Sequence, residues 1–210
     1  MKIDLHTHSI YSKDGLDSPR LMIKYAKKKK LDMLAITDHN TLLGSIVAKK
    51  IDPEFIVSGY EISTKDGDII ALGVDEYIES YLSAEETIER IHEVGGIAVA
   101  VHPYALFRRG VGNLITKLPF DAVEVMNGCD ILGLSNRRTK KVLSSVGMHN
   151  WVAGTDAHSA DSVGYTYTVV EANNEDEVLH EIKRGKTCIG GRTVPFSRII
   201  SMLRRRYIGF

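Results

Sequence analysis

The sequence predicts an α/β fold in which about seven strands, most of them followed by a helix, close into a distorted (β/α)7 barrel. Short apolar runs alternate with helical patterns along most of the 210 residues, which is typical of repeated strand–helix units. Polar side chains of the kinds that bind metals follow several of these runs. A closed ring brings the carboxyl ends of all its strands to one face, whereas an open sheet gathers a site at one switch point, so these polar strand ends favour the barrel.

The N-terminal half contains one predicted helix and four predicted strands. The helix begins at Ser18-Pro19, a cap residue followed by a residue suited to the first helical position, and it ends in the lysines of residues 27–30. The strands cover residues 1–9, 31–37, 55–62 and 68–74. A hairpin turn at residues 65–68 joins the last two without a helix, which makes the expected barrel irregular.

The C-terminal half begins with a capping box at residues 83–86, which opens a helix that stops at Gly95-Gly96. Strands are expected at 97–102, 121–126, 151–155 and 165–171, and further helices at 134–146 and about 175–184. Residues 196–210 are predicted to form a short helix with a basic end, Arg204–Arg206, that closes the barrel.

Length and composition indicate one domain over residues 1–210, because 43% hydrophobic residues can build one sizeable core. Acidic and basic residues balance at 27 each, so an anionic substrate must be recognised locally. The two cysteines, Cys129 and Cys188, show neither ligand nor disulfide spacing. No apolar run approaches the ~20 residues that span a bilayer, and the first strand leaves no room for a signal peptide, so we expect a cytoplasmic protein without membrane contact.

The candidate site begins with two histidines one residue apart, His6 and His8, which strand alternation places on one face together with Asp4. Five of the eight histidines lie at predicted strand ends, a concentration that indicates a metal centre. The candidate ligands, of which the last is the weakest, are His6, His8, Asp14, His39, Glu61, His102, Asp156, His158 and Asn127. Because an ion with an open position takes about three or four protein ligands, this set predicts two or three divalent ions, and imidazole with carboxylate favours zinc, manganese or iron.

Several short motifs, taken in order, resemble the polymerase and histidinol phosphatase (PHP) family. They are H-T-H-S at 6–9, D-G at 14–15, T-D-H at 37–39, G-x-E at 59–61, V-H-P at 101–103, E-V-x-N-G at 124–128 and G-T-D-A-H-S at 154–159. The resemblance extends to about Arg192 and leaves 193–210 as a helical, basic tail. It implies a distorted seven-stranded barrel with a trinuclear metal centre that hydrolyses phosphoesters, and an open cleft, since the inserted domain of larger members has no counterpart here.

The resemblance also implies how the ligands are divided, with Glu61 bridging two ions. One ion would be held by His6, His8, Glu61 and Asp156, a second by Asp14, His39 and His158, and a third by Glu61 and His102. The sequence departs from the family at two positions near the third ion. Asn127 lies in the stretch where some members have a histidine, and Ile70 precedes the L-G of the fourth strand, where many members have a histidine. We therefore expect the third ion to be held less tightly.

The expected nucleophile is a metal-bound hydroxide held by these ligands, because a metal ion lowers the pKa of bound water from ~15.7 toward ~7. Four arginines near the predicted rim are candidates for bidentate contacts with phosphate: Arg108, Arg109, Arg137 and Arg138. Asp4 and Asp38 are candidates for orienting a ligating imidazole, and Asp38 is equally well placed to cap a loop.

These features predict a metal-dependent phosphoesterase acting on a nucleotide or short oligonucleotide, as a phosphatase, phosphodiesterase or 5′-3′ exonuclease. A first alternative keeps the chemistry but changes the substrate to histidinol phosphate or another phosphomonoester metabolite. A second alternative, of another class, is a metal-binding or interaction module without turnover. The nearly complete ligand set argues against that alternative, while the physiological substrate, the native metal and the oligomeric state stay open.

Overall fold

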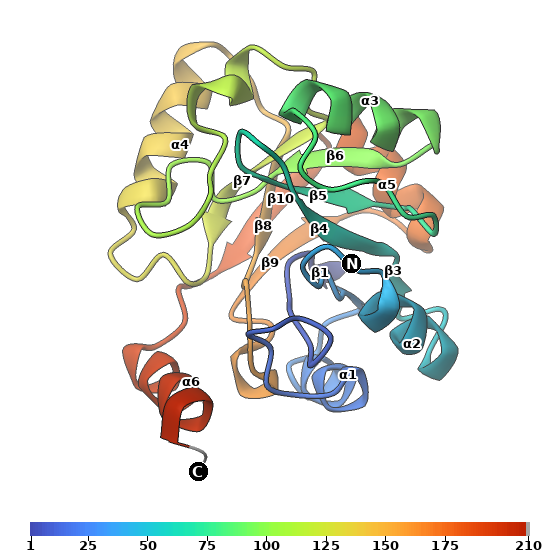
Figure 1. Ribbon diagram of the computed structural model, residues 1–210, viewed down its shortest axis with the longest axis vertical. Coiled ribbons are helices and arrows are strands. Elements are labelled where there is room, and N and C mark those ends of the chain that lie inside the picture. Colours follow the sequence, from blue (N-terminus) through green and yellow to red (C-terminus); the bar gives the residue numbers. More distant parts are fainter. Residues whose placement is uncertain (209–210) are drawn as a thin grey trace.

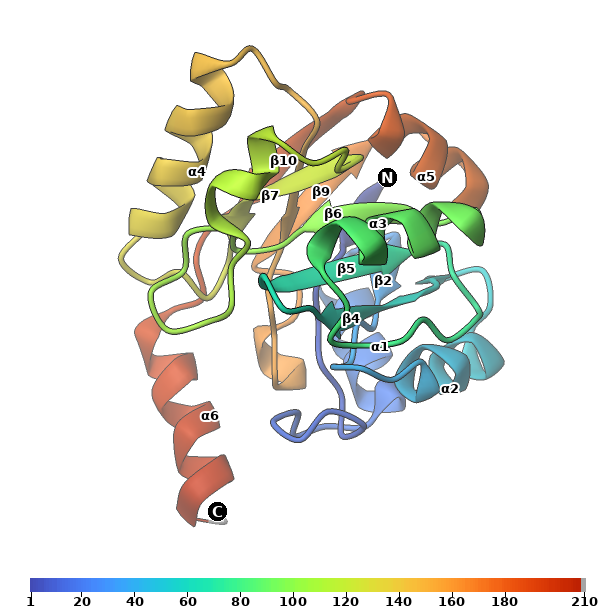
Figure 2. The same cartoon turned by 45° about the horizontal axis from the view of Figure 1, so that its top comes forward.

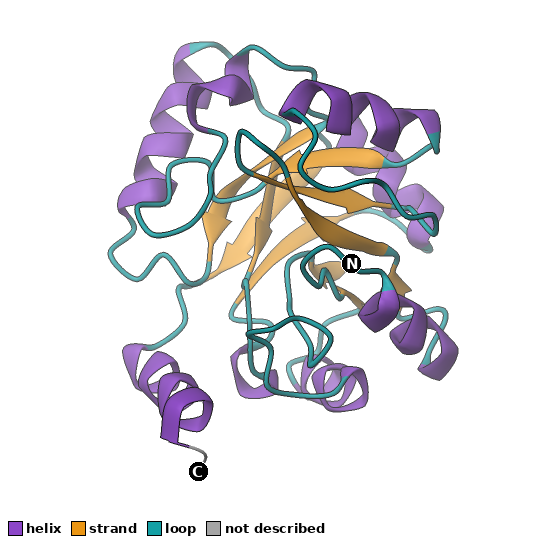
Figure 3. Cartoon of the chain, viewed as in Figure 1, coloured by secondary structure: helices purple, strands orange, loops and turns teal. Residues whose placement is uncertain are grey.

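The computed structural model describes residues 1–208, with strands in the centre and helices around them (Figure 1, Figure 3). The strands are β1 (Lys2–Asp4), β2 (Met33–Ala35), β3 (Ile56–Val57), β4 (Gly59–Ser63), β5 (Asp68–Leu72), β6 (Ile97–Ala100), β7 (Ala122–Asn127), β8 (Trp151–Gly154), β9 (Thr166–Val170) and β10 (Thr187–Gly191). The α-helices are α1 (Pro19–Lys28), α2 (Leu43–Ile51), α3 (Ala84–Glu93), α4 (Leu134–Ser145), α5 (Glu175–Lys183) and α6 (Phe196–Ile208). Two short 3-10 helices are η1 (Gly112–Thr116) and η2 (Ala160–Ser162).

Within residues 1–208 the strands form two five-stranded sheets, which corrects the prediction of a closed barrel. One sheet has the order β10-β9-β1-β2-β3 and the other β4-β5-β6-β7-β8. β1 is already paired on both edges, with parallel β2 and antiparallel β9, and β2 is paired with β1 and β3. Since a strand has only two edges for hydrogen bonding, β8 and β4 cannot pair with β1 and β2 along their length.

Two isolated bridges join the sheets at the end where the candidate ligands lie. Thr7, after β1, pairs in parallel with Ala157, after β8, and His39, after β2, pairs in parallel with Glu61 in β4. The amide of His8 donates to the carbonyl of Ala157 at 2.8 Å. These bridges join the two sheets at the end where the sequence predicts the carboxyl ends of strands to gather, and the side chain of Thr168 in β9 also bonds to the backbone of Ala153 in β8.

Side-chain alternation divides each sheet between different apolar clusters. In β5, Ile69 and Ala71 pack in a cluster with residues of α3, whereas Ile70 and Leu72 pack in a second cluster that includes Ile3 of β1. The second cluster draws on both sheets, so it is the common interior of the molecule. A third cluster packs α1 and α2 onto the first sheet.

Two local predictions are confirmed by hydrogen bonds and strand register. At the start of α3, the amide of Glu86 donates to the hydroxyl of Ser83 at 3.2 Å, and the amide of Ser83 donates to the Glu86 carboxylate at 2.9 Å, which is a complete capping box. The hairpin at 65–68 is also present, because β4 and β5 pair in antiparallel fashion with Ser63 opposite Asp68.

Three differences show where tertiary contacts override local signals. The predicted strand at 55–62 is two strands, β3 and β4, which belong to different sheets. They separate at Gly59, where a Cβ would lie 2.3 Å from the carbonyl oxygen of Ala71. The sequence analysis did not predict α2, whose first turn has no side-chain cap within the described residues, nor β10, which contains Gly190 and Gly191 and forms by pairing with β9.

Helix α6 extends away from the rest of the chain in both Figure 1 and Figure 2, so it does not close a barrel as predicted. The guanidinium of Arg205 donates to both carboxylate oxygens of Asp17, at 2.7 and 3.1 Å, and Arg198 donates to Asp161 at 2.8 Å. The end of the predicted tail, Phe210, lies outside the described residues. Of the helices within residues 1–208, none is sufficiently long and apolar to cross a membrane.

Candidate metal centre

Strand ends and loops from both sheets bring eight of the nine candidate ligands together. His6 and His8 follow β1, His39 follows β2, Glu61 lies in β4, His102 follows β6, Asp156 and His158 follow β8, and Asp14 lies in the loop before α1. Alternation in β4 turns Glu61 toward the same interior as its pairing partner Ile70, which explains why this carboxylate is fully buried.

Glu61 lies at the middle of this group, with four imidazole nitrogens around its carboxylate. Oε2 lies 3.4 Å from His6 Nε2, 3.3 Å from His8 Nε2 and 3.1 Å from His39 Nδ1, and Oε1 lies 3.3 Å from His102 Nε2. Within residues 1–208 neither oxygen has a hydrogen-bond partner of good geometry. The imidazoles therefore converge on Glu61 without satisfying it.

Asp156 supplies a second carboxylate to the same place. Its Oδ1 lies 3.3 Å from His8 Nε2, 3.6 Å from His6 Nε2 and 3.5 Å from His158 Nδ1. The Nε2 atoms of His6 and His8 are themselves only 3.1 Å apart. Imidazole nitrogens and carboxylate oxygens thus approach one point, as the ligands of a metal ion do.

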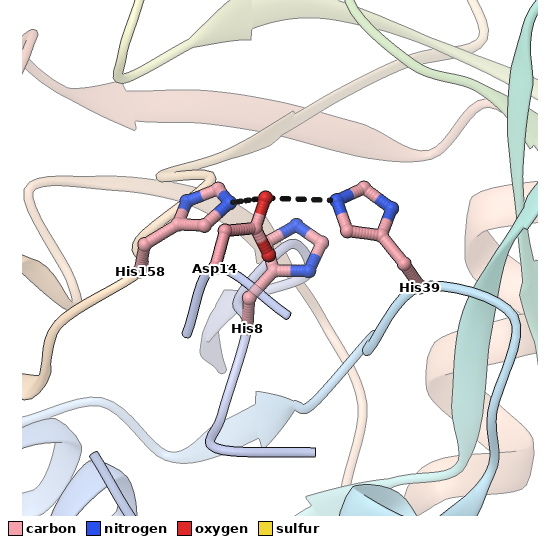
Figure 4. A group of neighbouring side chains, drawn as sticks. All are labelled: His8, Asp14, His39 and His158. Atoms are coloured by element: carbon pink, nitrogen blue, oxygen red, sulfur yellow. Dashed lines mark ion pairs between the residues drawn. The ribbon is translucent and has the colours of Figure 1, made fainter. Parts of the chain in front are cut away.

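Asp14 lies at a more exposed edge of the group (Figure 4). Its Oδ2 lies 3.2 Å from His158 Nε2 and 3.6 Å from His39 Nε2, and its buried Oδ1 has no hydrogen-bond partner among the described residues. The ring of His8 stacks against the rings of both His39 and His158, with centroid distances of 4.4 and 4.3 Å. These four side chains lie close enough to bind one ion.

The charges of the buried carboxylates and imidazoles depend on one another. Burial would raise the pKa of Glu61, but the imidazoles of His6, His102 and His39 hold it well below its usual value. Burial would lower the pKa of His6, but the carboxylates of Asp156, Glu124 and Glu61 raise it well above its usual value. In the absence of metal, protons on imidazole thus replace the positive charge that these carboxylates need.

The pKa values of His8 and His39 are shifted in opposite directions although their rings are stacked. Burial, with the neighbouring His158, lowers the pKa of His8 to about 3, so this ring is neutral, which is the form that binds metals. Burial would also lower the pKa of His39, but Asp14 and Glu61 raise it to about 9. A metal must therefore displace a proton from His39 but not from His8.

These observations fit a centre for divalent metal ions. Buried carboxylate oxygens without partners occur in Glu61 and Asp14, and the facing groups are imidazoles rather than lysines or arginines. A buried anion needs a compensating cation, and mixed nitrogen and oxygen donors suit zinc, manganese or iron. Four overlapping groups are close enough to bind an ion: His8, Asp14, His39 and His158; His6, His8 and Glu61; His6, His102 and Asp156; and Glu61, Asp68 and His102.

Asp68 completes the last of these groups, and the sequence analysis missed it. Its buried Oδ1 has no hydrogen-bond partner within the part of the chain that the structure describes, and burial, with nearby Glu61, raises its pKa to about 6. The available signal was the alternation of β5, which places Asp68, Ile70 and Leu72 on one face, the face that Glu61 shares.

Glu124 orients two candidate ligands, a function that the sequence analysis did not assign. Its Oε1 lies 3.0 Å from His6 Nδ1, and its Oε2 accepts from the amide of His102 at 2.9 Å. A carboxylate behind a ligating imidazole fixes the ring and leaves its other nitrogen for the metal. Strand alternation could have indicated this, since Glu124 shares a face of β7 with Ala122, which packs in the common interior.

The side-chain amide of Asn127, the ninth candidate ligand, makes hydrogen bonds to other residues of the protein. Its Nδ2 donates to Glu124 Oε2 at 2.9 Å and to Asp156 Oδ2 at 3.1 Å, and its Oδ1 accepts from the amide of Cys129 at 2.9 Å and from Arg108 at 3.1 Å. The structure thus gives Asn127 a positioning function.

Asp4 and Asp38 hold loops of the centre. The sequence analysis made both candidates for orienting an imidazole, but within residues 1–208 neither carboxylate contacts an imidazole nitrogen. Asp4 accepts from the amides of Thr155 and Gly164, both at 2.8 Å. Asp38 accepts from the amide and the hydroxyl of Ser9 at 2.6 and 2.7 Å, which is the loop-capping alternative.

Two of the four candidate arginines pair with carboxylates of the ligand groups: Arg109, whose Nε lies 3.7 Å from Asp68 Oδ1, and Arg108. The guanidinium of Arg108 donates to Asp156 Oδ2. Arg109 donates to the carbonyl of Thr64. Arg138 lies 4.2 Å from the centroid of the Tyr104 ring, and Arg137 is exposed on α4.

Three of the five non-glycine residues with a positive φ among the described residues lie at or beside the centre. His102 has a φ of 32° and Asp156 a φ of 57°, both in the left-handed region that non-glycine residues rarely adopt. Asn40, next to His39, has a φ of 54°. Such conformations cost about 1–3 kcal/mol each and persist where the surrounding structure requires them, which is typical of functional sites.

Comparisons with known proteins show which sequences and folds this chain resembles. A model of the PHP domain matches residues 4–189. An uncharacterised protein of Methanocaldococcus jannaschii is 44% identical in an alignment of 149 residues, and the match covers 65% of this chain and 87% of that protein. Phosphoribosyl 1,2-cyclic phosphate 1,2-diphosphodiesterase of Eggerthella lenta is 31% identical over 99 residues, 42% of this chain and 37% of that enzyme.

A solved structure shares the fold. It is a two-domain protein from Bacteroides vulgatus that contains a predicted PHP-like metal-dependent phosphoesterase. The TM-score is 0.72 with 16% identity, and the match covers 91% of this chain and 65% of that chain. This chain therefore spans slightly less than two thirds of that protein, and at this identity the likeness concerns the fold alone.

Proposed function

This chain belongs to the PHP domain family, and from that premise we propose that it hydrolyses phosphoesters with two or three divalent metal ions. The observation that carries the proposal is the arrangement around Glu61. Four imidazole nitrogens lie within 3.1–3.4 Å of its two oxygens, which have no hydrogen-bond partners among the described residues. A carboxylate surrounded in this way is suited to bridge two ions.

The proposed ligands combine these four overlapping groups with the division among three ions that the family resemblance implies. His6, His8, Glu61 and Asp156 would bind one ion, Asp14, His39 and His158 a second, and Glu61, Asp68 and His102 a third. When bound, such ions supply Lewis acidity toward a phosphoryl oxygen and make water acidic enough to act as the nucleophile at neutral pH. Glu124 keeps His6 Nε2 directed at the centre through its contact with His6 Nδ1.

Arg108 is the residue we propose to bind the phosphoryl group. Its guanidinium contacts Asp156 and Asn127, while the side chain is 33% exposed, so it reaches from the centre to solvent. Burial opposes its charge, but Asp156 raises the pKa of Arg108 above its usual value, and it stays cationic. A planar guanidinium matches the spacing of phosphoryl oxygens and would exchange part of its contact with Asp156 for them.

For the substrate we propose a nucleotide or a short oligonucleotide. His39 and Asp14 are 31% and 22% exposed, which supports access by a substrate of some size. The Eggerthella lenta relative is named for a phosphodiesterase activity, which supports phosphodiester as well as monoester hydrolysis.

The test combines metal analysis with a substrate panel. Protein purified without chelator is assayed on a nucleoside monophosphate, a short oligonucleotide and histidinol phosphate, with His8→Ala and Asp156→Ala as inactive controls. We expect hydrolysis of the nucleotide or oligonucleotide that is lost with chelator and restored by Mn²⁺. Faster hydrolysis of histidinol phosphate would contradict the nucleotide substrate and favour a phosphomonoester metabolite. Metal loading without turnover of any ester would favour a non-catalytic module.

A further inference from the structure

A cavity of about 220 Å³ lies directly beside the candidate metal centre. His102, Arg108 and Asn127 line it, and these three residues also belong to or contact the centre. A substrate whose phosphoryl group contacts Arg108 would therefore place the adjoining part of the molecule in this cavity. What lines the rest of the cavity then indicates what that part is.

The remaining wall is largely apolar and is open to solvent. Five large apolar side chains line it and are exposed: Leu106, Phe107, Ile131, Leu132 and Leu134. Phe107 is 98% exposed, so it makes almost no contact with the rest of the protein. Apolar side chains gathered in this way at a cavity are typical of a ligand site, because a ligand that covers them removes apolar surface from water.

Two polar atoms of the wall lack a hydrogen-bond partner within residues 1–208, His102 Nδ1 at the metal centre and the hydroxyl of Ser135. Ser135, in the first turn of α4, is only 7% exposed, and its hydroxyl has no hydrogen-bond partner within residues 1–208. A buried hydroxyl is normally hydrogen-bonded, and a hydroxyl can both donate and accept. An occupant with one hydrogen-bonding group among apolar atoms would satisfy Ser135 and cover the apolar wall together.

We propose that this cavity binds the base of the nucleotide substrate while Arg108 contacts the phosphoryl group, an inference that rests on the proposed function. A base has a flat, weakly polar face for Phe107 and Leu106 and hydrogen-bonding groups at its edge for Ser135. The cavity is smaller than the ~300–1,000 Å³ of sites that enclose drug-sized ligands, so it takes one ring system. A hydroxyl-rich sugar would lose hydrogen bonds to water against the apolar side chains of this wall.

Two esters with the same phosphoryl group test this, adenosine 5′-monophosphate and ribose 5-phosphate, because only the first carries a base. The readout is the ratio of their kcat/KM values. We expect Phe107→Ala to lower this ratio by about tenfold, the scale of one base–aromatic stacking contact, mainly through KM. Phe196→Ala, which removes an exposed phenyl ring of α6, is the matched control and should keep the ratio.

Ser135→Ala should lower the same ratio, whereas Ser144→Ala, an exposed serine of the same helix, should not. If Phe107→Ala and Ser135→Ala leave the ratio unchanged, the base does not bind in this cavity. The thermal unfolding of each variant is measured alongside, and both should melt near the wild type, since Phe107 is exposed and the Ser135 hydroxyl is unpartnered within the described chain.

A binding measurement separates this inference from the proposed activity. Saturation-transfer NMR with chelator-treated protein and millimolar adenosine 5′-monophosphate detects binding of the base without any hydrolysis. Transfer to the adenine protons that disappears in Phe107→Ala supports the cavity even if neither ester is hydrolysed. Absence of transfer to wild-type protein overturns it, even if the protein hydrolyses other phosphoesters.

Discussion

The candidate metal centre has an inner group (His6, His8, Glu61, His102 and Asp156) and an outer group (Asp14, His39 and His158), and the two differ in burial. Side chains of the inner group are at most 4% exposed, whereas those of the outer group are 13% to 31% exposed. Both contain imidazoles and a carboxylate, so their chemistry is similar. Their access to solvent differs, and this difference predicts different affinities and exchange rates for the ions that the two groups bind.

The two groups also differ in how they are held. In the inner group, Glu124 binds both the ring of His6 and the amide of His102, and a Cβ at Gly154 would lie 2.4 Å from that of His6. The outer group depends on loops, where the hydroxyl of Ser12 accepts from the amide of His39 at 2.9 Å. We infer that the inner group is rigid before metal binds and that the outer group adjusts with metal and substrate.

The largest expected difference comes from removing one carboxylate from each group. Glu61→Gln should lower activity by about 10³-fold or more and remove more than one equivalent of metal, because Glu61 contacts ligands of several ions. Asp14→Asn should remove about one equivalent, since Asp14 faces only the outer imidazoles. Elemental analysis after gel filtration measures both, and equal losses would contradict the distinction between the groups.

The support of the inner group is tested by Glu124→Gln. The amide keeps the size of the side chain but loses the charge behind His6 and His102, so metal affinity should fall by about 10–100-fold. Glu89→Gln, at an exposed position of α3, is the control. Competition with a fluorescent chelator gives the affinities, and identical values for both variants would show that Glu124 does not support the ligands.

The pH dependence should distinguish His39 from His8. Asp14 and Glu61, against the effect of burial, raise the pKa of His39 to about 9, whereas burial lowers the pKa of His8 to about 3. At pH 7 a metal must therefore displace a proton from His39, so affinity at the outer group should rise by up to about tenfold per pH unit and level off near pH 9.

Proton release during titration with Mn²⁺ in weak buffer measures this effect. His39→Ala should release fewer protons than the wild type. The stability of the metal-free chain should change with pH in the opposite direction to metal affinity. The raised pKa of His39 stabilises the fold fully below about pH 6.5, and this contribution is lost as the pH rises through about 9. Metal loading that is independent of pH between 6 and 9 would contradict the assignment of His39.

The smallest expected effect concerns the connection between α6 and the loop that carries Asp14. Although burial opposes it, Arg205 and the amide of Ala160 hold the pKa of Asp17 below its usual value. A carboxyl group whose pKa is lower in the folded chain than in the unfolded chain stabilises the fold at pH values above its unfolded pKa. This contribution is lost as the pH falls through the folded pKa. Asp17→Asn should therefore reduce the free energy of unfolding at pH 7 by about 0.5–1 kcal/mol, since the pair is partly solvated.

Urea unfolding at pH 7 and at pH 3 checks this prediction. The difference between wild type and Asp17→Asn should shrink at the lower pH, where the carboxyl begins to be protonated. A difference of the same size at both values would assign the effect to lost packing rather than to charge. Activity should change less than in Asp14→Asn, because Asp17 contacts Arg205 and the amide of Ala160 and lies in none of the four ligand groups within residues 1–208.

The sequence predicted much of the site because strand ends carry its side chains. His6, His39, His102 and Asp156 each follow an apolar run, and the structure brings all four together. Asp68 and Glu124 were missed since neither follows a strand: Asp68 begins β5 and Glu124 lies inside β7, so only the face of the sheet on which each carboxylate lies indicates its function. Asn127, conversely, ends β7 like a ligand, but its amide is taken up by Glu124 and Asp156.

By itself the sequence determined the strand–helix alternation, the capping box of α3, the hairpin between β4 and β5, and the family. These depend on local periodicity, on residues a few positions apart or on short ordered motifs. Only the tertiary structure decided that β3 and β4 belong to different sheets, and that these sheets meet through the bridges at Thr7 and His39. It also decided which ligands are buried. The reason is physical: edge pairing, burial and the pKa values that follow from it depend on groups far apart in the chain.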